Sequence, residues 1–352
     1  NNDWHLLYKM TWELTPLKKL FLSYDASMNI NQGYYMPRAF ASTYFPYRYM
    51  NILDNYNTIT RDTRLINMNW THTLSTKSFY EFTLGKFSTM EHSAVQDLPW
   101  TDYQERLDLE PINYNIDNTD QDGNIQITYG DEFYDTGFAP EWYDLSSENT
   151  RMDIDWTYHT ETRHKLKTGF EHTITDIQVL DIDEPWSGSS GFGANYDSYN
   201  AKTYFGAFYF QDRIIFEGMT LNIGFRTDYW IPGRYVEDAI QDTSNIIITD
   251  EARVIFEEET FDFPWAGDPF KMKARISPRF GISHPVTDND VLYFYYGHFS
   301  QLPTFQYVYA KINSKSQSTY QVFGNPNLNP KTTVQYELGV KHRFSEDQVL
   351  EL

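Results

Sequence analysis

The sequence of 352 residues contains no cysteine, few basic residues and no long apolar run. Without cysteine the chain has no disulfide framework and no zinc site built on thiolates. Lysine and arginine number 28 against 49 aspartate and glutamate residues, which gives a formal net charge of −21. This balance argues against nucleic acid as a partner, because little basic surface exists to neutralise phosphates. No apolar run approaches the roughly 18 residues of a transmembrane helix, so helical membrane spans are excluded.

Aromatic residues are the main enrichment, since 28 Tyr, 25 Phe and 9 Trp make up 18% of the chain. Sheet faces favour aromatic residues in general, whereas membrane barrels place them in girdles at the lipid–water interface. A membrane-spanning strand needs only about 9–11 residues with alternate ones apolar, so a low overall hydropathy does not argue against it. The sequence starts at Asn1 with no signal peptide, so we expect any secretion signal to lie outside it.

Period-two alternation of apolar and polar residues predicts about twelve β-strands. In residues 219–230, Leu221 and Phe225 alternate with polar residues such as Asn222 and Arg226. One face of each strand is therefore apolar and the other strongly polar. The polar face is expected to carry Asp25, Asp155, Arg226, Asp228, Gln335, Glu337 and Lys341. The predicted strands are 4–14, 18–30, 62–74, 79–92, 149–160, 164–177, 200–213, 219–230, 274–285, 290–299, 332–344 and one from 348.

The connections between these strands alternate between short and long. The long ones run through roughly 31–61, 93–148, 178–199, 231–273 and 300–331. Loops beyond about 12–15 residues are uncommon in compact soluble domains, whereas outer-membrane barrels have tight turns at one rim and long loops at the other. We therefore predict an all-β, transmembrane, antiparallel up-and-down barrel with short periplasmic turns and long extracellular loops. Its apolar face would meet lipid and its polar face the lumen.

Three sequence blocks follow one another in the last third of the chain. They are S-P-R-x-G at 277–281, Y-G-x-F-x-Q-x-P at 296–303, and G-N-P-N-L-x-P at 324–330 leading into T-x-x-Y-E-x-G at 333–339. In this order and spacing, residues of about 275–344 resemble the barrel of TonB-dependent outer-membrane receptors. Over residues 1–274 the resemblance is architectural only, in long aromatic strands and large acidic loops.

The resemblance implies a barrel of about 22 strands in a Gram-negative-type outer membrane, with a plug domain inside it. It also implies contact with TonB and energised import of a bulky nutrient such as a siderophore, cobalamin, a glycan or a peptide. The sequence departs from this pattern because it contains neither a plug-like segment nor a TonB-box-like start. We therefore expect residues 1–352 to be a single barrel region, an interior fragment of a larger receptor. A complete barrel of about twelve strands is the alternative.

One long loop contains N-T-D-Q-D-G-N-I at 118–125, which matches the start of an EF-type calcium loop. Asn118, Asp120 and Asp122 fall at ligand positions 1, 3 and 5, before a glycine at the sharp turn. Position 12 should supply a bidentate carboxylate but is Tyr129, so weak affinity is expected for a calcium ion in the 118–131 loop. Acidic Asp-Gly segments also occur simply as turns.

Two of the long loops are rich in aromatic residues. The residues concerned are Tyr34, Tyr35, Tyr44, Phe45, Tyr47 and Trp265. Exposed aromatic side chains are unfavourable unless they pack together or meet a partner. They predict either a surface for a ligand or a partner protein, such as a surface lipoprotein, or loops that pack on themselves. The acidic loops argue against a ligand attracted by long-range positive charge.

No catalytic site is predicted, because the sequence has neither H-E-x-x-H nor G-x-S-x-G and its nine His are scattered. The favoured function is a receptor barrel that imports a nutrient. A structural outer-membrane barrel whose loops hold partner proteins, without transport, is the first alternative. A soluble carbohydrate-binding β-sandwich is the second.

Overall fold

A computed structural model describes residues 2–32, 46–109, 112–119, 125–129, 133–188, 192–264, 270–313, 323–345 and 348–351. Thirteen of its strands form one antiparallel sheet, and twelve of these pair in a simple path in which each strand lies beside the next. This is the up-and-down order that the sequence predicts. The twelve are β1 (Asn2–Thr15), β2 (Lys18–Asn31), β3 (Thr58–Ser75), β4 (Ser78–Ala94), β7 (Glu141–His159), β8 (His164–Asp183), β9 (Asn195–Phe216), β10 (Met219–Ile231), β12 (Phe270–Pro285), β13 (Asp290–Gln301), β14 (Lys331–Arg343) and β15 (Val349–Glu351).

The long connections contain short elements that the alternation pattern does not predict. Strand β11 (Phe261–Phe263) pairs with β12, while β5 (Ile112–Thr119) and β6 (Ile125–Tyr129) form a separate hairpin. The helices are α1 (Arg234–Gln241), α2 (Asp250–Glu259) and α3 (Gln306–Tyr309), with 3₁₀ turns η1 (Pro46–Tyr49), η2 (Leu53–Asn55) and η3 (Trp100–Asp102). None of the helices in the described ranges is long and apolar enough to cross a membrane.

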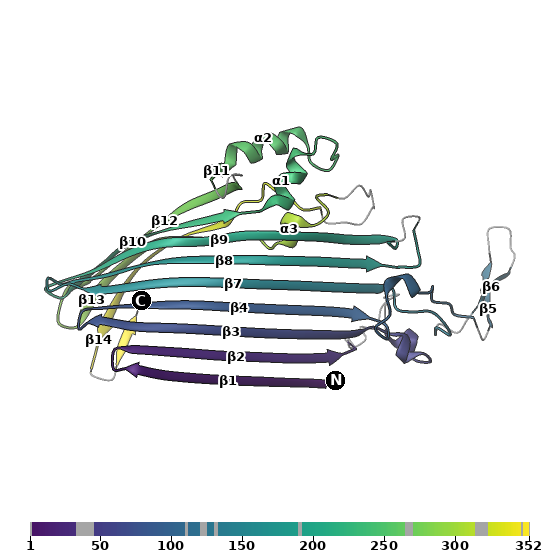
Figure 1. Cartoon of the computed structure of the whole chain (residues 1–352), viewed down its shortest axis with the longest axis horizontal. Coiled ribbons are helices and arrows are strands. Elements are labelled where there is room, and N and C mark those ends of the chain that lie inside the picture. The colour runs from purple at the N-terminus through teal and green to yellow at the C-terminus, as the bar shows by residue number, and fades with distance from the viewer. Residues whose placement is uncertain are drawn as a thin grey trace.

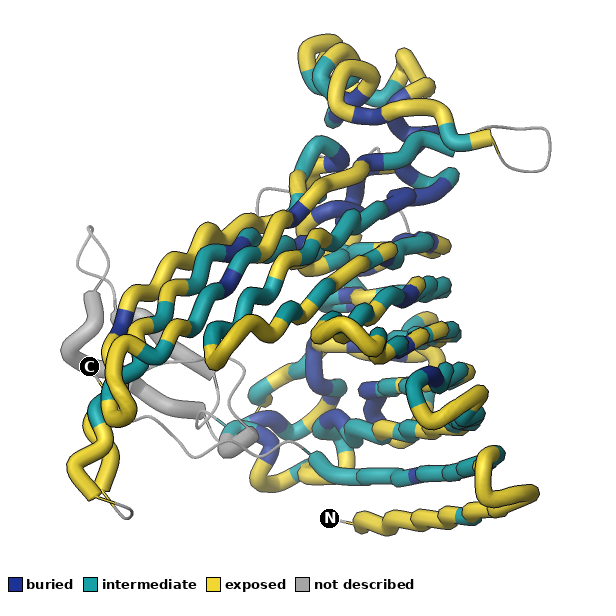
Figure 2. The backbone as a smooth tube through the Cα atoms, turned by 90° about the vertical axis from the view of Figure 1, so that its left-hand side faces the viewer, coloured by how far each residue is buried: buried dark blue, intermediate teal, exposed yellow. Residues whose placement is uncertain are grey.

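The tight turns and the long connections lie at opposite ends of the sheet (Figure 1). The hairpins β1–β2, β3–β4 and β7–β8 each close through a few residues at one end, whereas the helices and the β5–β6 hairpin lie at or beyond the other. We call the second end the external end. The sheet is not flat but curves, so that its C-terminal strands cross the line of its N-terminal ones (Figure 2). This is the shape of a barrel wall.

The pairing register places the polar residues of neighbouring strands on one face. Asp155 lies opposite Gly169, Gly169 opposite Tyr209, and Tyr209 opposite Arg226. Because side chains directly opposite each other share a face, this row defines what we call the inner face. The alternate residues then form the outer face. A slip of one residue in any pairing would move charged side chains to the outer face, so the pattern fixes the register.

The outer face carries large apolar side chains that are exposed along the whole sheet. On β14, Val334, Tyr336 and Leu338 are 52%, 77% and 70% exposed. Exposed apolar residues follow the outer positions of the other strands, for example Trp156 on β7 and Phe225 on β10. An apolar surface of this extent is incompatible with water and suits lipid. The soluble-sandwich alternative is therefore wrong, because in the described part of the chain no second sheet covers this face.

The buried apolar residues gather at the external end instead of between two sheets. One cluster, which we call the helical cluster, packs α1, α2 and α3 against the ends of β9 and β10. It includes Trp230, Val236, Phe256 and Tyr309. A second cluster, the tyrosine cluster, joins the first three long connections through Tyr49, Val95, Tyr103, Tyr134, Ala139, Trp142 and Ile182. The long connections are thus folded structures built on top of the wall.

The two faces of β14 give a direct test of the membrane assignment. We expect Leu338→Arg in the full-length protein to reduce the free energy of unfolding by about 2–4 kcal/mol, because an arginine on the lipid side cannot remain hydrated. Gln335→Arg on the inner face of the same strand should be close to neutral. The measurement is denaturant unfolding from lipid vesicles. Equal losses for the two variants would contradict the assignment of the faces.

Candidate functional site

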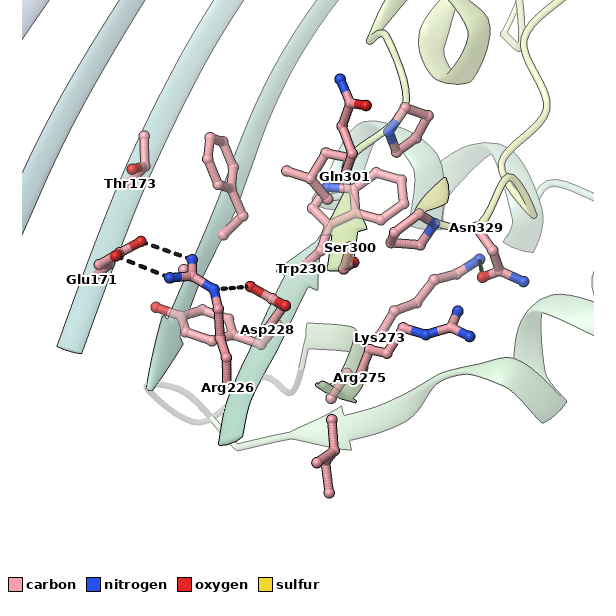
Figure 3. A pocket seen from close by; sticks show the side chains of 18 of the residues that line it. Glu171, Thr173, Arg226, Asp228, Trp230, Lys273, Arg275, Ser300, Gln301 and Asn329 are labelled. Atoms are coloured by element: carbon pink, nitrogen blue, oxygen red, sulfur yellow. Dashed lines mark hydrogen bonds and ion pairs between the residues drawn. The ribbon is translucent and has the colours of Figure 1, made fainter. Parts of the chain in front are cut away.

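A cavity of about 970 Å³ opens on the inner face near the external end (Figure 3). Strands β7 to β10, β12 and β13 supply its wall, and residues 301–305 and 329–330 of the last long connection close its top. Four cationic side chains and three carboxylates line it. They are Arg151, Arg226, Lys273 and Arg275, with Glu171, Asp228 and Glu259. The cavity therefore has a small excess of positive charge in a chain whose net charge is −21.

Arg226 is fixed by two carboxylates on the cavity wall. Its terminal nitrogens donate to the two oxygens of Glu171 at 3.0 and 2.8 Å, and its Nε donates to Asp228 Oδ1 at 2.6 Å. Glu171 lies on β8 and Arg226 on β10, so the pair spans the intervening strand β9. The residue of β9 opposite Glu171 is Ala207, whose small side chain leaves room for the pair to cross. Arg226 is thus held by charge-assisted hydrogen bonds from all three of its nitrogens and acts as a rigid part of the wall.

Arg275 differs from Arg226 because it is exposed in the cavity. Its position on β12 is directly opposite Asp228, but Asp228 already accepts from Arg226. Among the described residues, no hydrogen bond or ion pair is found for the Arg275 guanidinium, and no dashed line joins it to the other side chains drawn in Figure 3. A guanidinium has five donors in a planar fork that matches carboxylate and phosphate oxygens. Arg275 is therefore the residue of this wall best placed to bind an anionic ligand.

Lys273, two residues away, has a structural role. It is 4% exposed, and its Nζ donates at 3.1 Å to both Asn327 O and Asn329 Oδ1. Glu259 Oε2 lies 3.5 Å from the same nitrogen. Asn327 in turn donates to the carbonyl of Ala252 in α2 at 2.8 Å. The G-N-P-N-L-N-P stretch is thus anchored to β12 and α2, which holds the last long connection over the cavity.

A smaller cavity of about 450 Å³ continues along the inner face and shares Glu171 and Arg226 with the first. Tyr209 donates a hydrogen bond to Asp155 across β8. Gly169 makes this contact possible, because a Cβ there would lie 2.5 Å from the Tyr209 ring and 2.7 Å from Asp155. On the other side of the cavity, the guanidinium of Arg279 lies 4.9 Å from the centre of the Phe299 ring. The S-P-R-x-G and Y-G-x-F blocks therefore meet through a cation–π contact.

The residues predicted from sequence to bind ligands fall largely outside the described ranges. Tyr34, Tyr35, Tyr44, Phe45 and Trp265 lie outside them, as do Asp120 and Asp122. Tyr47 belongs to η1 and Asn118 to β5, but only their backbones are described. The calcium loop and the aromatic contact surface therefore stay predictions.

Tyr49, from the same aromatic loop, is fully buried in the tyrosine cluster. Its ring centre lies 4.9 Å from that of Tyr134 and 5.4 Å from that of Tyr56. Tyr49 therefore packs within its own loop through Tyr56 and against the next long connection through Tyr134, and is not available as an exposed contact residue.

The polar-face analysis correctly placed Arg226 and Asp228 on the inner face, but it did not single out Glu171, Lys273 or Arg275. A signal for two of these three is present in the sequence. Residues 271–275 read K-M-K-A-R, three cations at alternate positions in an acidic chain. Alternation places all three on one face of a strand, so a local positive site was predictable there.

Carboxylates face one another on the inner face at the external end, beyond the apolar band. Asp181 on β8 lies directly opposite Asp197 on β9, and Asp197 Oδ1 accepts from the backbone N–H of Lys311 at 3.2 Å. Burial, together with the charges of Glu141, Asp197 and Asp183, raises the pKa of Asp181 to about 6, while Lys311 opposes the shift. Burial also raises the pKa of Asp197. The contact between the last long connection and the sheet is therefore sensitive to pH.

Lys273→Met tests how the last long connection is held. The substitution removes the ammonium but keeps the stem, and we expect amide exchange in residues 323–330 to accelerate by an amount equivalent to about 1–3 kcal/mol. Lys271→Met is the matched control, because Lys271 pairs with the more exposed Glu257 and Asp262 at 2.6 and 3.0 Å. Surface pairs of this kind contribute little. Equal exchange in the two variants would show that Lys273 is not the anchor.

Asp181→Asn tests the pH dependence. Because the pKa of Asp181 is raised in the folded protein, from 3.8 to about 6, its contribution to stability is largest below pH 3.8 and is lost as pH rises through 6. The variant should therefore raise the thermal midpoint of the full-length protein at pH 7.5 and change it progressively less towards pH 4. A gain that is the same at all pH values would contradict the assignment.

Comparison with known proteins identifies the family. Residues 11–352 match the family described as TonB dependent receptor-like, beta-barrel. No curated protein matches the chain. Three solved structures are similar in fold. The alcaligin outer-membrane receptor FauA of Bordetella pertussis is 12% identical with a TM-score of 0.51, and the match covers 98% of this chain and 41% of FauA. FpvA of Pseudomonas aeruginosa bound to heterologous pyoverdines is 14% identical with a TM-score of 0.54 (97% of this chain, 40% of FpvA), and the ferric-catecholate import receptor Fiu of Escherichia coli K12 is 14% identical with a TM-score of 0.51 (99% of this chain, 50% of Fiu).

The chain thus spans 40% to 50% of the length of these three structures. At 12% to 14% identity they establish the fold, and the family match establishes the relationship. The predicted strands, their order and the three sequence blocks agree with this family relationship. The chain belongs to the TonB-dependent receptor-like β-barrel family, which places it in the outer membrane of a Gram-negative-type bacterium.

Proposed function

We propose that this chain is part of a TonB-dependent transporter that imports a bulky anionic metal chelate. The observation that carries the proposal is the exposed guanidinium of Arg275 in an inner-face cavity of about 970 Å³. A cavity of this size is at the upper end of the range for small-molecule sites, roughly 300–1,000 Å³. The three similar structures support the substrate class, because they are an alcaligin receptor, FpvA bound to pyoverdines and a ferric-catecholate import receptor.

The charges of the site favour an anion held by contact and not by long-range attraction. The chain carries −21 overall, so an anion approaching from solution is repelled at a distance. At the cavity wall Arg226 binds both Glu171 and Asp228, and Arg151 lies 4.0 Å from Glu171, so two cations face two carboxylates and Arg275 is left as a local cation. A chelate that carries carboxylate or catecholate oxygens would gain charge-assisted hydrogen bonds only once it lies in the cavity. Such a site selects its ligand by where the anionic oxygens of the ligand lie in the cavity.

The partners are part of the same proposal. Import against a concentration gradient requires energy, which TonB would supply through a plug segment of the larger receptor. We also propose that the strands described here form part of a larger barrel, because this chain spans only 40% to 50% of the three solved structures. Calcium at residues 118–131 and a loop-bound protein partner remain predictions of the sequence.

Uptake of radioactive iron tests the function. Cells that produce the full-length protein, with and without TonB, are supplied with ferric citrate or with a ferric catecholate complex. We expect uptake of at least one complex to depend on TonB. Arg275→Ala should weaken its binding by about 10- to 100-fold, the value of one lost charged hydrogen bond. Lys165→Ala, which removes a cation from the turn end of β8, should leave binding unchanged. Absence of TonB-dependent uptake would favour the scaffold alternative.

A further inference from the structure

A third cavity, of about 650 Å³, lies on the opposite side of the sheet from the inner-face site. Its lining comes from outer-face positions of β7 to β10, β11 and β12 and is almost entirely apolar. The apolar lining residues are Met152, Phe170, Ile174, Tyr204, Phe208, Tyr229, Ile231, Phe261, Phe263, Phe270, Met272 and Ala274. We call it the outer groove. The outside of a barrel wall is convex, and strand pairing alone does not produce a hollow there.

Strand β11 builds one wall of the outer groove. Phe261 lies opposite Met272 and Phe263 opposite Phe270, so this short strand adds two aromatic side chains beside the external end of β12. Phe270 in turn packs against Tyr204 with ring centres 5.8 Å apart. The groove is thus walled by aromatic side chains on the side towards the external end.

A glycine in β9 opens the floor. Gly206 lies between His172 of β8 and Tyr229 of β10 in the pairing register. A Cβ at this position would come within 2.6 Å of the Tyr229 hydroxyl. Without it, the Tyr229 hydroxyl reaches His172 Nδ1 across β9 and the two polar groups satisfy each other. The floor therefore needs no water, as expected of a surface that faces hydrocarbon.

The outer groove lies where the apolar band of the outer face gives way to charged residues. On β8 the outer positions run through Phe170, His172 and Ile174 and then reach Asp176. Opposite Asp176 on β9 is Lys202, which is exposed and lies two residues before Tyr204, on the external side of the apolar outer positions of that strand. Since the long connections mark the external end, the groove faces the external leaflet and Lys202 lies at its polar boundary.

A second cation, Arg234, follows a glycine that packs on Lys202. Gly233, with a φ of +94°, packs so closely on β9 that a Cβ there would lie 2.0 Å from the carbonyl oxygen of Lys202. The next residue, Arg234, places its guanidinium 4.4 Å from the centre of the Phe270 ring. Arg234 is held by Glu237 at 2.6 Å. An apolar hollow with an exposed lysine two residues beyond Tyr204, the lining residue of β9 nearest the external end, is complementary to an acyl chain that ends in an anionic headgroup.

We propose that the outer groove binds a phosphorylated lipid of the external leaflet, with one acyl chain between the aromatic walls and the phosphate beside Lys202. The proposal does not depend on the transported substrate, because the two cavities lie on opposite faces. Acyl chains already surround this face, so transfer from bilayer to groove gains little from the hydrophobic effect. Specificity must then come from close packing in the groove and from the phosphate contact, and each can be removed separately.

Native mass spectrometry of the full-length protein, delipidated in detergent, tests the site. The two probes are dimyristoyl phosphatidic acid and dimyristoylglycerol, which share acyl chains and differ in the phosphate. We expect the wild type to retain phosphatidic acid about fivefold more than diacylglycerol, the effect of one lysine at a membrane surface. Lys202→Gln should remove this preference but leave diacylglycerol retention unchanged.

Thr227→Trp, which fills the floor of the outer groove, should abolish retention of both lipids. Leu338→Trp adds the same side chain to the outer face of β14, away from the groove, and is the control for folding and for general changes of the lipid surface. Equal retention by the two tryptophan variants would overturn the groove. Equal retention of the two lipids by the wild type would overturn the phosphate contact.

Discussion

The structure depends on one constraint: in hydrocarbon, every backbone N–H and C=O must find a partner within the protein. Strands satisfy it only by pairing on both sides, and each strand of the path from β2 to β14 pairs with the strand before it and the strand after it in that path. The same constraint allows side chains to differ completely between the two faces. Leu338 is 70% exposed on one side of β14 while Glu337 stands on the other, and no packed second layer is required to stabilise either.

Because the wall is not stabilised by a sandwich core, apolar packing occurs at the external end. The helical and tyrosine clusters bury residues from all five long connections, which are otherwise polar and acidic. Cationic side chains also hold the backbone of these connections in place. Arg253 donates to the backbone carbonyls of Ile240, Asp242, Asn245 and Ile248, so one guanidinium holds the turn between α1 and α2. Lys273 holds the last long connection by donating to Asn327 and Asn329.

All twelve strands of the path could be predicted from the sequence, because lipid on one side and a polar lumen on the other impose a strict period of two. The helices α1 and α2 could not, since their residues pack against strand ends that are distant in sequence. The candidate site was only partly predictable. Alternation places Arg226 on the inner face, but its partner Glu171 is 55 residues away, and only the register across β9 brings them together. The cavity belongs to the sheet and not to any one segment.

Because this chain has few cationic side chains, the contacts of each one indicate its role. In a chain of 28 basic and 49 acidic residues, a cation that is not required structurally is expected to be neutralised by a nearby carboxylate. Arg226, Lys273 and Arg253 are each held by several oxygens of the protein. Arg275 on the inner face and Lys202 on the outer face are instead exposed beside a cavity. Arg275 lies on the inner face, beneath the folded long connections. Lys202 lies on the outer face, at the edge of the lipid. A wall one strand thick can therefore present a ligand site on each face, because alternate side chains of each strand serve opposite faces, and the two cavities share only Tyr229 and Ala274 in their linings.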